Sequence, residues 1–530
     1  MEPETIIVLI VFAFIAYAVY LVWIQIKGWN EFKERRKQQG LAKAIQEGRK
    51  PYGKPMGHAY GSAYLMTPNQ IAENTLGFKP KDFAERNKTG DLGFLFFGEM
   101  NIWPKGHKEP SEVAYPALEG PGHAITIAPT RSGKGAGAVI PNLLIYSGSV
   151  IVNDIKGENY AVTSRYRRLV GQDVYKLAPF DDETAHWNPF DVLARSEDPW
   201  DDARHMAELL ITDEPGKDEF WSNGARNLLT GLILYVSDTA VPESRSLSHL
   251  RDLLTQDQED FDLTLGQMGT SENKIIARAA NVFQRADAKV QSGILSTLDS
   301  ELAFLDSERL ARCTQNSDFS FEDLKKENIS IYLIMPPERL RTYAPFMRLF
   351  MGIAALELKR TKDKPESPVL LMMDEFPALG RMKVIEHEIS YLAGYEVRLW
   401  LFAQDLKQLV SIYGQNAQSI IANCRVKQFF GVADYETAQL VSHMCGNTTV
   451  PNISVSSSTG VDIMNTTESI GDRSRPLFDP NEVMNLPNNK QLLFFQGYPP
   501  ILAIKLNYYE AVAIFTHKGE NLYDENPFHT

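Results

Sequence analysis

Two stretches that lie far apart in the chain carry residues suited to binding and hydrolysing a nucleotide. The first reads IAPTRSGKGAG at residues 127–137 and approximates the phosphate-loop pattern G-x-x-x-x-G-K-[ST]. In such a loop Lys134 reaches the β and γ phosphates, while Gly133 and Gly135 let the backbone approach them closely. A strand before the loop and a helix after it aim backbone N–H groups at the phosphates. Taken alone, the same letters also fit an ordinary glycine-rich turn.

The loop departs from this pattern at two places. Ala128 stands where the pattern has its first glycine, and Gly135 stands where it has a hydroxyl residue. That hydroxyl normally binds Mg²⁺. We therefore expect Thr130, Ser132 or waters held by carboxylates to serve the metal instead.

The second stretch, PVLLMMDEFPALG, is an apolar run that ends in two carboxylates, Asp374 and Glu375. A carboxylate at the end of a strand that neighbours the loop can hold Mg²⁺, directly or through water. We expect Asp374 to take that role and Glu375 to orient and deprotonate the attacking water. The alternative is an acidic turn without a catalytic role. Because the same chain carries the lysine loop, the two stretches together predict a nucleoside triphosphatase.

Three further groups are weaker candidates for the same site. Gln404 ends the apolar run VRLWLFAQ and can sense the γ-phosphate, although a surface amide fits there as well. Arg425 precedes another apolar run and is either an arginine finger that acts across a subunit boundary or a plain surface arginine. Asp154, Lys156 and Glu158 either support the site or lie in a solvated loop.

Other nucleotide- and metal-dependent classes lack their signatures in this chain. We find no LSGGQ of ABC transporters, no kinase H-R-D with D-F-G, and no zinc-binding H-E-x-x-H. The N-K-x-D motif of GTPases is also missing, so ATP with Mg²⁺ is the expected nucleotide. The 3 cysteines lie far apart, which argues against a disulfide framework or a structural zinc. A net charge of −13 does not suggest non-specific coating of DNA.

The scaffold for these residues is predicted from short apolar runs that each end in a polar loop. Such runs, with helical patterns between them, predict strands buried on both faces of a mostly parallel α/β sheet. Pro141 should kink the helix after the lysine loop. From 188 to 318 we find almost no strand signal, which predicts an all-α domain inserted into the sheet. Residues 446–475, rich in Ser, Thr, Asn and Gly, predict a mobile loop. The predicted strands are 123–128, 149–154, 329–335, 369–375, 397–404, 426–432 and 490–497.

A single membrane anchor is predicted at the N-terminus. Residues 6–26 form an uncharged apolar run that is long enough to span a bilayer as a helix. An acidic flank before the run and the lack of a small-residue cleavage site after it argue against a signal peptide. Because residues 27–37 are basic, the positive-inside rule puts the rest of the chain in the cytoplasm.

These patterns divide the chain into six segments. A length of 530 residues is too great for one core, so two or three folded units are expected. The segments are a membrane anchor (1–27), a juxtamembrane and N-terminal part of the ATPase domain (28–120), the first ATPase part with the lysine loop (121–190), the inserted all-α domain (191–318), the second ATPase part with the two carboxylates (319–515) and a C-terminal tail (516–530).

Several motifs, in this order, resemble the TraG-type coupling proteins of conjugation and type IV secretion systems. The resemblance runs from about residue 120 to about residue 510 and includes the helical interval. A glycine after the lysine recurs in this family's loop, so we interpret Gly135 as a family trait. The motifs are GHAITIAPTRSGKGAGAVIPNLL, GSVIVNDIKGENY, DEFWSNGARNLL, MMDEFPALGRM, FAQDLKQL, and RPLFDPNEVMNLP with QGYPPILAIKLNYYE.

The resemblance implies a RecA-like P-loop ATPase domain, an all-α domain facing the cytoplasm, and a hexameric ring at the bacterial inner membrane. It implies that the ring brings a relaxase–DNA complex or an effector protein to the secretion channel and drives its transfer with ATP. For this chain it implies that Asp374 serves Mg²⁺, that Glu375 activates water and that the lysine loop binds the phosphates. The loop residues concerned are Ala128, Thr130, Arg131, Ser132, Gly133, Lys134, Gly135 and Ala136.

Two features depart from the family's pattern. We expect one membrane helix where members commonly carry two, and a chain end without the long C-terminal extension of some members. Two other functions therefore stay open. One is a DNA translocase like FtsK or HerA, although the helical insertion and the lack of a DNA-reading winged helix argue against the FtsK version. The other is a non-hydrolysing receptor in which nucleotide only stabilises the ring.

Overall fold

The computed structural model describes most of the chain after residue 60. The predicted membrane anchor at 6–26 lies outside the described residues. Among the helices of the described part, none is long and apolar enough to cross a membrane. The described residues divide into a larger compact unit, within 68–441, 480–498 and 502–530, and a smaller one, within 61–67, 442–479 and 499–501. The described ranges are 61–89, 91–102, 112–212, 219–460, 463–511, 514–517 and 520–528.

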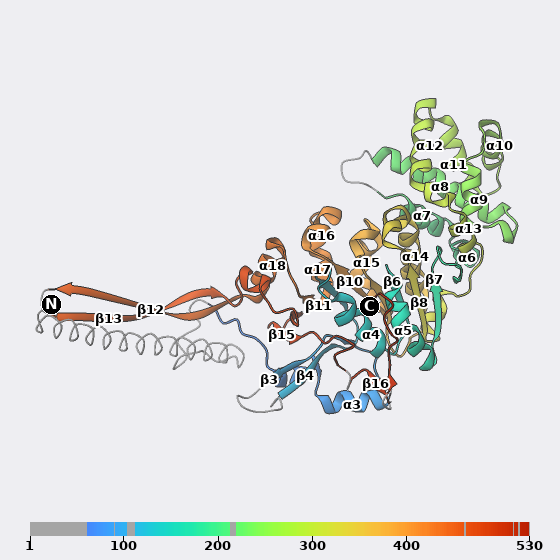
Figure 1. Ribbon diagram of the computed structural model, residues 1–530. Coiled ribbons are helices and arrows are strands. Elements are labelled where there is room, and N and C mark those ends of the chain that lie inside the picture. Colours follow the sequence, from blue (N-terminus) through green and yellow to red (C-terminus); the bar gives the residue numbers. More distant parts are fainter. Residues whose placement is uncertain are drawn as a thin grey trace, which may run out of the picture. The chain divides into compact units, whose positions relative to one another are not determined.

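A nine-stranded sheet carries most of the larger unit (Figure 1). Its order is β15-β14-β11-β5-β10-β9-β6-β8-β7. The strands from β11 to β7 in this order run parallel, and β14 pairs antiparallel with β11. Every residue of β5, β6, β8, β9 and β10 is buried, because helices cover both faces of these apolar runs. The strands are β5 (His123–Ile127), β6 (Val150–Asp154), β7 (Asp173–Leu177), β8 (Ile329–Ile334), β9 (Val369–Met373), β10 (Val397–Ala403), β11 (Cys424–Phe429), β14 (Lys490–Phe495) and β15 (Ile501–Ile504).

The predicted strands are all present, with ends that shift by a few residues. The sheet is mixed rather than wholly parallel because of β14. The sequence prediction missed β7 and β15. Both are partly exposed edge strands at the two ends of the sheet, so neither has the continuous apolar run used as the signal.

The helix after the lysine loop is broken as Pro141 predicts. A π-helical turn, η1 (Gly135–Val139), precedes α4 (Ile140–Ile145), and the Ile140 N–H donates to the Gly135 carbonyl. Pro141 has no N–H for the Gly137 carbonyl, so a regular α-helical ladder cannot run through this point. The other helices of the sheet region are α5 (Glu158–Leu169), α14 (Leu340–Arg360), α15 (Lys383–Leu392), α16 (Leu406–Tyr413), α17 (Asn416–Asn423), α18 (Tyr435–Cys445) and α19 (Pro480–Met484), with the short 3₁₀ turns η4 (Phe321–Lys325), η5 (Pro337–Arg339), η6 (Phe376–Leu379) and η7 (Ala393–Tyr395).

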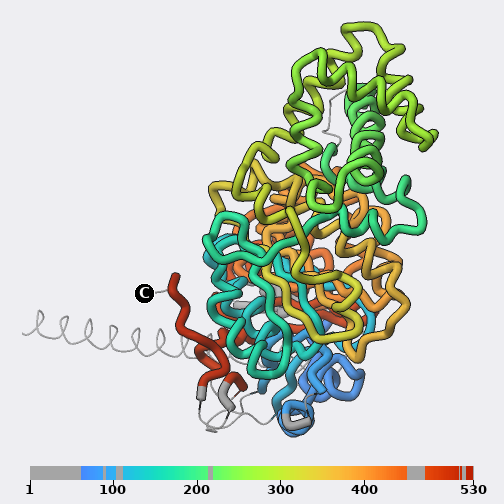
Figure 2. The backbone as a smooth tube through the Cα atoms, turned by 90° about the vertical axis from the view of Figure 1, so that its right-hand side faces the viewer, coloured from blue at the N-terminus to red at the C-terminus, as the bar shows by residue number. Residues whose placement is uncertain are grey.

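Between β7 and β8 the described chain is helical, and its helices α8 to α12 gather in one group (Figure 2). The long helix α8 packs against α7, α11 and α12. Helices α9 to α13 each begin at a Ser, Asp or Asn whose side chain accepts a backbone N–H of the first turn, which stabilises the helix start. The elements are α6 (Phe190–Ala194), α7 (Pro199–Leu210), α8 (Glu219–Thr239), η2 (Pro242–Ser244), α9 (Leu247–Leu254), α10 (Gln258–Gly269), α11 (Lys274–Arg285), α12 (Ala288–Leu302), η3 (Ala303–Asp306) and α13 (Glu308–Cys313).

The predicted mobile loop at 446–475 is wrong. These residues form an antiparallel hairpin of β12 (Asn447–Gly460) and β13 (Ile463–Pro476), in register from Asn447 opposite Pro476 to Gly460 opposite Ile463. The prediction weighed the Ser, Asn and Gly content. It neglected the Thr, Val and Ile residues that recur along both halves and favour extended backbone.

A small antiparallel sheet before β5 was also not predicted. Its strand β4 pairs with β1, β2 and β3. The short neighbouring strands are too brief to give a periodic signal. The elements are α2 (Pro68–Glu73), β1 (Gly77–Phe78), α3 (Pro80–Thr89), β2 (Leu95–Phe96), β3 (Met100–Ile102) and β4 (Glu112–Leu118), and near the C-terminus β16 (Thr516–His517) pairs with β17 (Glu520–Asn521).

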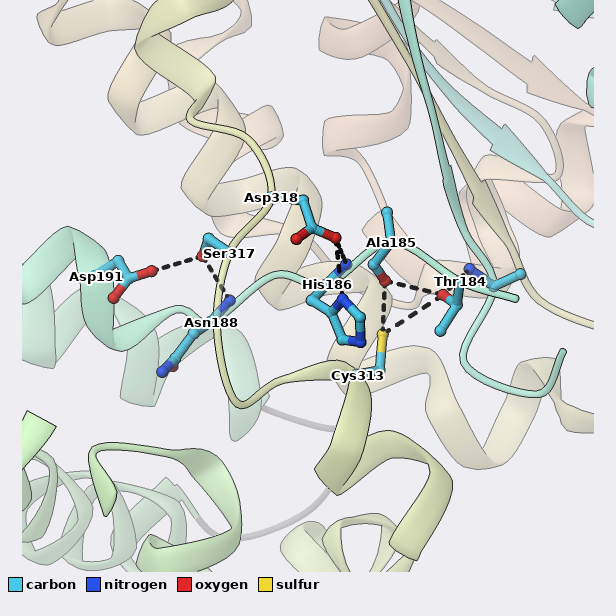
Figure 3. A network of polar contacts seen from close by, with 9 residues as sticks. Thr184, Ala185, His186, Asn188, Asp191, Cys313, Ser317 and Asp318 are labelled. Atoms are coloured by element: carbon cyan, nitrogen blue, oxygen red, sulfur yellow. Dashed lines mark hydrogen bonds and ion pairs between the residues drawn. The ribbon is translucent and has the colours of Figure 1, made fainter. Parts of the chain in front are cut away.

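The two linkers that connect the helical segment to the sheet lie side by side (Figure 3). We call them, at residues 184–191 and 313–318, the junction. The Trp187 N–H donates to the Cys313 carbonyl at 2.9 Å, which joins one linker to the other. The Trp187 side chain is 3% exposed, so the junction is anchored in an aromatic core. The rings around it are Phe321, Phe346 and Phe350.

Side chains also bond the two linkers of the junction (Figure 3). Asp318 Oδ2 accepts the His186 backbone N–H at 2.8 Å and lies 3.0 Å from His186 Nδ1. Ser317 Oγ accepts the Asn188 backbone N–H at 2.9 Å and donates to Asp191 Oδ2 at 2.6 Å. The polar groups of the junction thus satisfy one another.

Candidate active site

Three of the predicted residues meet at the carboxyl ends of β5, β9 and β10. Lys134 Nζ lies 3.4 Å from Glu375 Oε2, and these side chains are 12% and 17% exposed. Gln404 Nε2 donates to Glu375 Oε1 at 2.8 Å. Because β10 lies between β5 and β9 in the sheet, its end brings Gln404 between the loop and the carboxylates. The lysine, glutamate and glutamine form one charged group that solvent can reach.

The lysine loop reaches this group directly from β5. The Ala128 N–H donates to the Ala403 carbonyl at 2.9 Å, which fixes the start of the loop to the end of β10. Arg131 and Gly133 have positive φ angles of 63° and 85°, so the chain turns sharply at both. A Cβ added at Gly135 would meet nothing within 4 Å. The loop therefore has an open side from which a ligand can approach.

The two hydroxyl groups predicted as metal ligands, those of Ser132 and Thr130, differ in hydrogen bonding and in exposure. Ser132 Oγ donates to the Pro129 carbonyl at 2.6 Å, so this hydroxyl already has a partner within the loop. Thr130 and its neighbour Arg131 are exposed. The loop's last predicted residue, Ala136, lies in η1, where its carbonyl accepts the Tyr508 N–H at 3.0 Å. Of the two hydroxyls, Thr130 is the more accessible to a ligand.

Asp374 lies behind Glu375 at the end of β9. Its Oδ1 accepts the Glu375 backbone N–H at 3.0 Å, and its carbonyl accepts from Asn153 Nδ2 at 2.7 Å. Burial raises the pKa of Asp374, the charge of Lys134 lowers it, and the charge of Glu375 raises it. Glu375 has a positive φ of 51°, a conformation that costs on the order of 1 kcal/mol for a non-glycine residue. The turn thus holds both carboxylates in a fixed, strained arrangement.

The polar end of β6 belongs to the same group, and sequence reasoning gave it only a minor place. Asp154 is buried, its Oδ2 accepts the Tyr160 N–H at 2.8 Å, and burial raises its pKa to about 7. The charge of Asp374 adds to that rise. Asn153 Oδ1 is buried without a hydrogen-bond partner among the described residues. In the sequence, the only indication of a role for Asn153 and Asp154 is that these two polar residues end the apolar run SVIVND.

Other predicted residues do not join this group. Arg425 lies near the start of β11, and since Cys424 stands opposite His123 in the parallel β5, this is the amino end of the sheet. Its Nη1 donates to the Pro121 carbonyl at 3.3 Å. The structure therefore brings Arg425 to the edge opposite the lysine loop of its own chain.

Of the two remaining charged candidates after β6, Glu158 stands near enough for its charge to raise the pKa values of Asp154 and Asp374. Its Oε1 accepts from Asn526 Nδ2 at 2.5 Å, near the C-terminus. Lys156 is exposed.

Sequence reasoning missed a second lysine at the loop. Lys505 Nζ donates to the Ser132 carbonyl across 373 sequence positions. The segment IKLNYYE that contains it carries no local pattern that reveals such a distant contact. Only the folded chain shows it.

The residues present fit a polyphosphate and a hard cation. Lys134 and the open side at Gly135 suit a phosphate, while the Asp374 carboxylate and the unpaired Asn153 Oδ1 are oxygen groups of the kind Mg²⁺ or its waters take. Within the described ranges no three His, Cys, Asp or Glu side chains gather as a metal site. Mg²⁺ is usually held by one or two carboxylates together with waters and substrate phosphates.

Comparison with known proteins supports one family. Residues 62–526 match the family model described as type IV secretory system conjugative DNA transfer. The chain is 33% identical over 395 residues to VirD4 of Agrobacterium fabrum, covering 73% of this chain and 58% of VirD4. It is 28% identical over 424 residues to the conjugal transfer protein TraG of Escherichia coli, covering 72% and 66%. The chain thus spans less than two thirds of these relatives.

Solved structures of the conjugative coupling protein TrwB share the fold. The complex of TrwB with ADP and Mg²⁺ has a TM-score of 0.56 at 15% identity and covers 76% of this chain and 88% of that chain. The complex with the non-hydrolysable ATP analogue ADPNP has a TM-score of 0.57 at 17% identity and covers 72% and 85%. At this identity the likeness concerns the fold alone.

Proposed function

The chain belongs to the type IV secretory system conjugative DNA transfer family, and on that premise we propose that it is the coupling ATPase of such a system. It forms a hexameric ring at the bacterial inner membrane, held by one helix at 6–26. The ring receives a relaxase–DNA complex or an effector protein and drives it into the secretion channel with ATP. The observation that carries the proposal is the Lys134, Glu375 and Gln404 group in a chain of this family.

Each residue of the group has a chemical role in this proposal. Lys134 and the loop backbone bind the β and γ phosphates of ATP. Lys134 and Glu375 lie 3.4 Å apart, so a phosphate that engages the lysine competes with the glutamate for it. Gln404 still holds Glu375 by Oε1, which orients Oε2 to accept a proton from the attacking water. Asp374 would hold Mg²⁺, which would neutralise charge on the phosphates when bound.

The rest of the chain serves transfer in this proposal. The sheet and its helices form a RecA-like ATPase domain, and the all-α domain at 191–318 receives the cargo. Arg425 lies at the edge opposite its own loop, so a catalytic role for it requires the site of a neighbouring subunit. TrwB, whose fold this chain shares, has been seen with ADP and Mg²⁺, which supports nucleotide as the ligand.

The decisive test replaces the loop lysine. We expect Lys134→Ala to weaken MgATP binding and to lower turnover by about a hundredfold or more, because it removes the positive charge from the phosphates. Binding is measured by titration calorimetry, turnover by phosphate release, and transfer in a mating or secretion assay. Lys326→Ala is the matched control, since Lys326 is exposed, pairs with Glu322 and Asp323, and precedes the start of β8 at the opposite edge of the sheet. Unchanged binding and turnover in Lys134→Ala would contradict the proposal.

A second experiment separates the two cargo classes. Single- and double-stranded DNA are added to the purified chain at low salt, and ATP turnover is measured. Stimulation supports DNA as cargo. Turnover that DNA leaves unchanged points to protein cargo.

A further inference from the structure

Lys505 is a nearly buried lysine that lies against the lysine loop. Lys505 follows β15, and its backbone N–H donates to the Asn489 carbonyl at 2.8 Å. The residue is 5% exposed. The ammonium donates to the Ser132 carbonyl and lies 4.6 Å from the centre of the Phe430 ring. The loop therefore has two lysines, Lys134 within it and Lys505 beside it.

The charge of Lys505 is poorly compensated. Across the described ranges no carboxylate lies within ion-pair distance of its ammonium, and its described partners are one carbonyl and one aromatic ring. Burial lowers the pKa of Lys505, and the charge of Glu510 opposes that shift. A buried cation without a counter-ion is costly, and an anion at the neighbouring loop offsets that cost. The surroundings of the Lys505 ammonium thus favour a negatively charged ligand at the loop.

The bond to the Ser132 carbonyl also sets the direction of a donor in the loop. In a trans peptide the C=O and the following N–H point in opposite directions. With the Ser132 carbonyl held by Lys505, the Gly133 N–H points away from Lys505. Among the described residues none accepts this N–H. A loop whose free N–H groups face outward from its supports is the arrangement that binds phosphate.

The glycines of the loop are fitted to the Lys505 side chain. A Cβ added at Gly133 would lie 2.8 Å from Lys505 Nζ, and one added at Gly137 would lie 2.5 Å from Lys505 Cγ. The positive φ of 85° at Gly133 separately favours glycine. Gly137, by contrast, is required for space alone. The close packing of both glycines on one lysine shows that loop and side chain are shaped to each other.

We propose that Lys505 is a second positioning lysine of the nucleotide site, which holds the Ser132–Gly133 peptide in its phosphate-binding orientation and offsets polyphosphate charge from behind the loop. The proposal rests on the proposed function, namely that the loop binds ATP. It assigns to Lys505 an effect on nucleotide affinity rather than on the chemical step. Lys505 touches the loop and not the reacting atoms.

The test compares Lys505→Met with Lys427→Met in the full chain. Lys427 is partly buried and, like Lys505, donates to a backbone carbonyl, that of Cys424 at 2.6 Å. This bond lies at the opposite edge of the sheet. We expect the Kd for MgADP and the KM for MgATP to rise about tenfold or more in Lys505→Met, as loss of a charge-assisted hydrogen bond allows, with kcat changed less than about threefold. We expect Lys427→Met to leave both constants unchanged, while the two variants melt at similar temperatures without ligand.

Gly137→Ala provides a second route to the same result. Its Cβ displaces the Lys505 side chain, so the variant should weaken nucleotide binding in the wild-type background and have little further effect in Lys505→Ala, where the crowded atoms are gone. Additive losses would overturn the coupling between these residues. If Lys134→Ala abolishes binding while Lys505→Met binds like wild type, this inference is wrong and the proposed function stands. If the wild-type chain does not bind nucleotide, both fall.

Discussion

The junction and the candidate active site use similar polar residues in opposite ways. In the junction His186, Asn188, Ser317 and Asp318 bond to one another, and the network joins two linkers. In the active site the lysine and glutamate are 3.4 Å apart, two carboxylates have raised pKa values, and a buried amide oxygen lacks a partner among the described residues. The difference is that the polar groups of the junction hydrogen-bond to one another, whereas the candidate active site keeps charged and polar groups available to a ligand.

The largest expected effect lies in the candidate active site and is a loss of turnover. We expect Glu375→Gln to lower kcat for ATP by about a thousandfold, because an amide cannot accept the proton of the attacking water. MgATP binding should be kept or strengthened, because Lys134 loses its competing partner at 3.4 Å. Phosphate release and equilibrium binding measure the two effects. Glu436→Gln, an exposed glutamate on α18, serves as control. Turnover within tenfold of wild type would remove Glu375 from its catalytic role.

The second effect concerns the pH dependence of stability that the buried carboxyl group of Asp154 creates. Asp154 has an ordinary pKa of 3.8 that burial raises to about 7, so the folded chain keeps a proton that the unfolded chain releases. The wild-type free energy of unfolding should therefore fall relative to Asp154→Asn as pH rises from about 4 to about 7, and the gap should stay constant above that range. We expect the difference in free energy of unfolding between the two chains to change by an amount on the order of 2–4 kcal/mol from pH 4 to pH 8.

Denaturant melts of both chains between pH 4 and pH 8 measure this gap. The asparagine keeps an oxygen to accept the Tyr160 N–H but loses the Oδ1 that accepts from Asn159 Nδ2 at 3.3 Å. This loss is the same at every pH, so the change of the gap with pH isolates the charge. A gap that is the same at every pH would show that Asp154 titrates normally. The raised pKa of Asp154 would then no longer distinguish the candidate active site from the junction.

The smallest effect is expected in the junction and falls on stability alone. Ser317→Ala removes the acceptor of the Asn188 N–H and the donor to Asp191, and should lower the free energy of unfolding by about 1–2 kcal/mol. The Kd for MgATP should not change. Denaturant melts and titration calorimetry provide the two readings, with exposed Ser296→Ala on α12 as control. A weaker Kd in Ser317→Ala would show that the junction and the nucleotide site are coupled.

The sequence predicts those parts of the fold in which a local residue pattern is compatible with a single structure. Strands such as β8 and β9 are continuous apolar runs because both faces are covered, so they are visible without a structure. Lys134, Glu375 and Gln404 were found because each follows such a run and parallel strands bring their ends to one edge. The break at Pro141 follows from its missing N–H.

What the sequence did not predict depends on tertiary contacts or on weak patterns. Lys505 reaches the loop across 373 positions, and Asn153 supports Asp374 from another strand. The hairpin of β12 and β13 was hidden because polar β-branched residues resemble a loop in composition and differ from it in conformational preference.

The junction has a consequence for how such proteins diversify. Because the Trp187 N–H bonds the Cys313 carbonyl, the helical segment leaves the sheet and returns to it at a single point. A segment with adjacent ends adds little loop-closure entropy to its host and can be lengthened, shortened or exchanged without changing the strand order. Insertions, deletions or exchanges in the helical segment are therefore compatible with an unchanged sheet and an unchanged candidate active site.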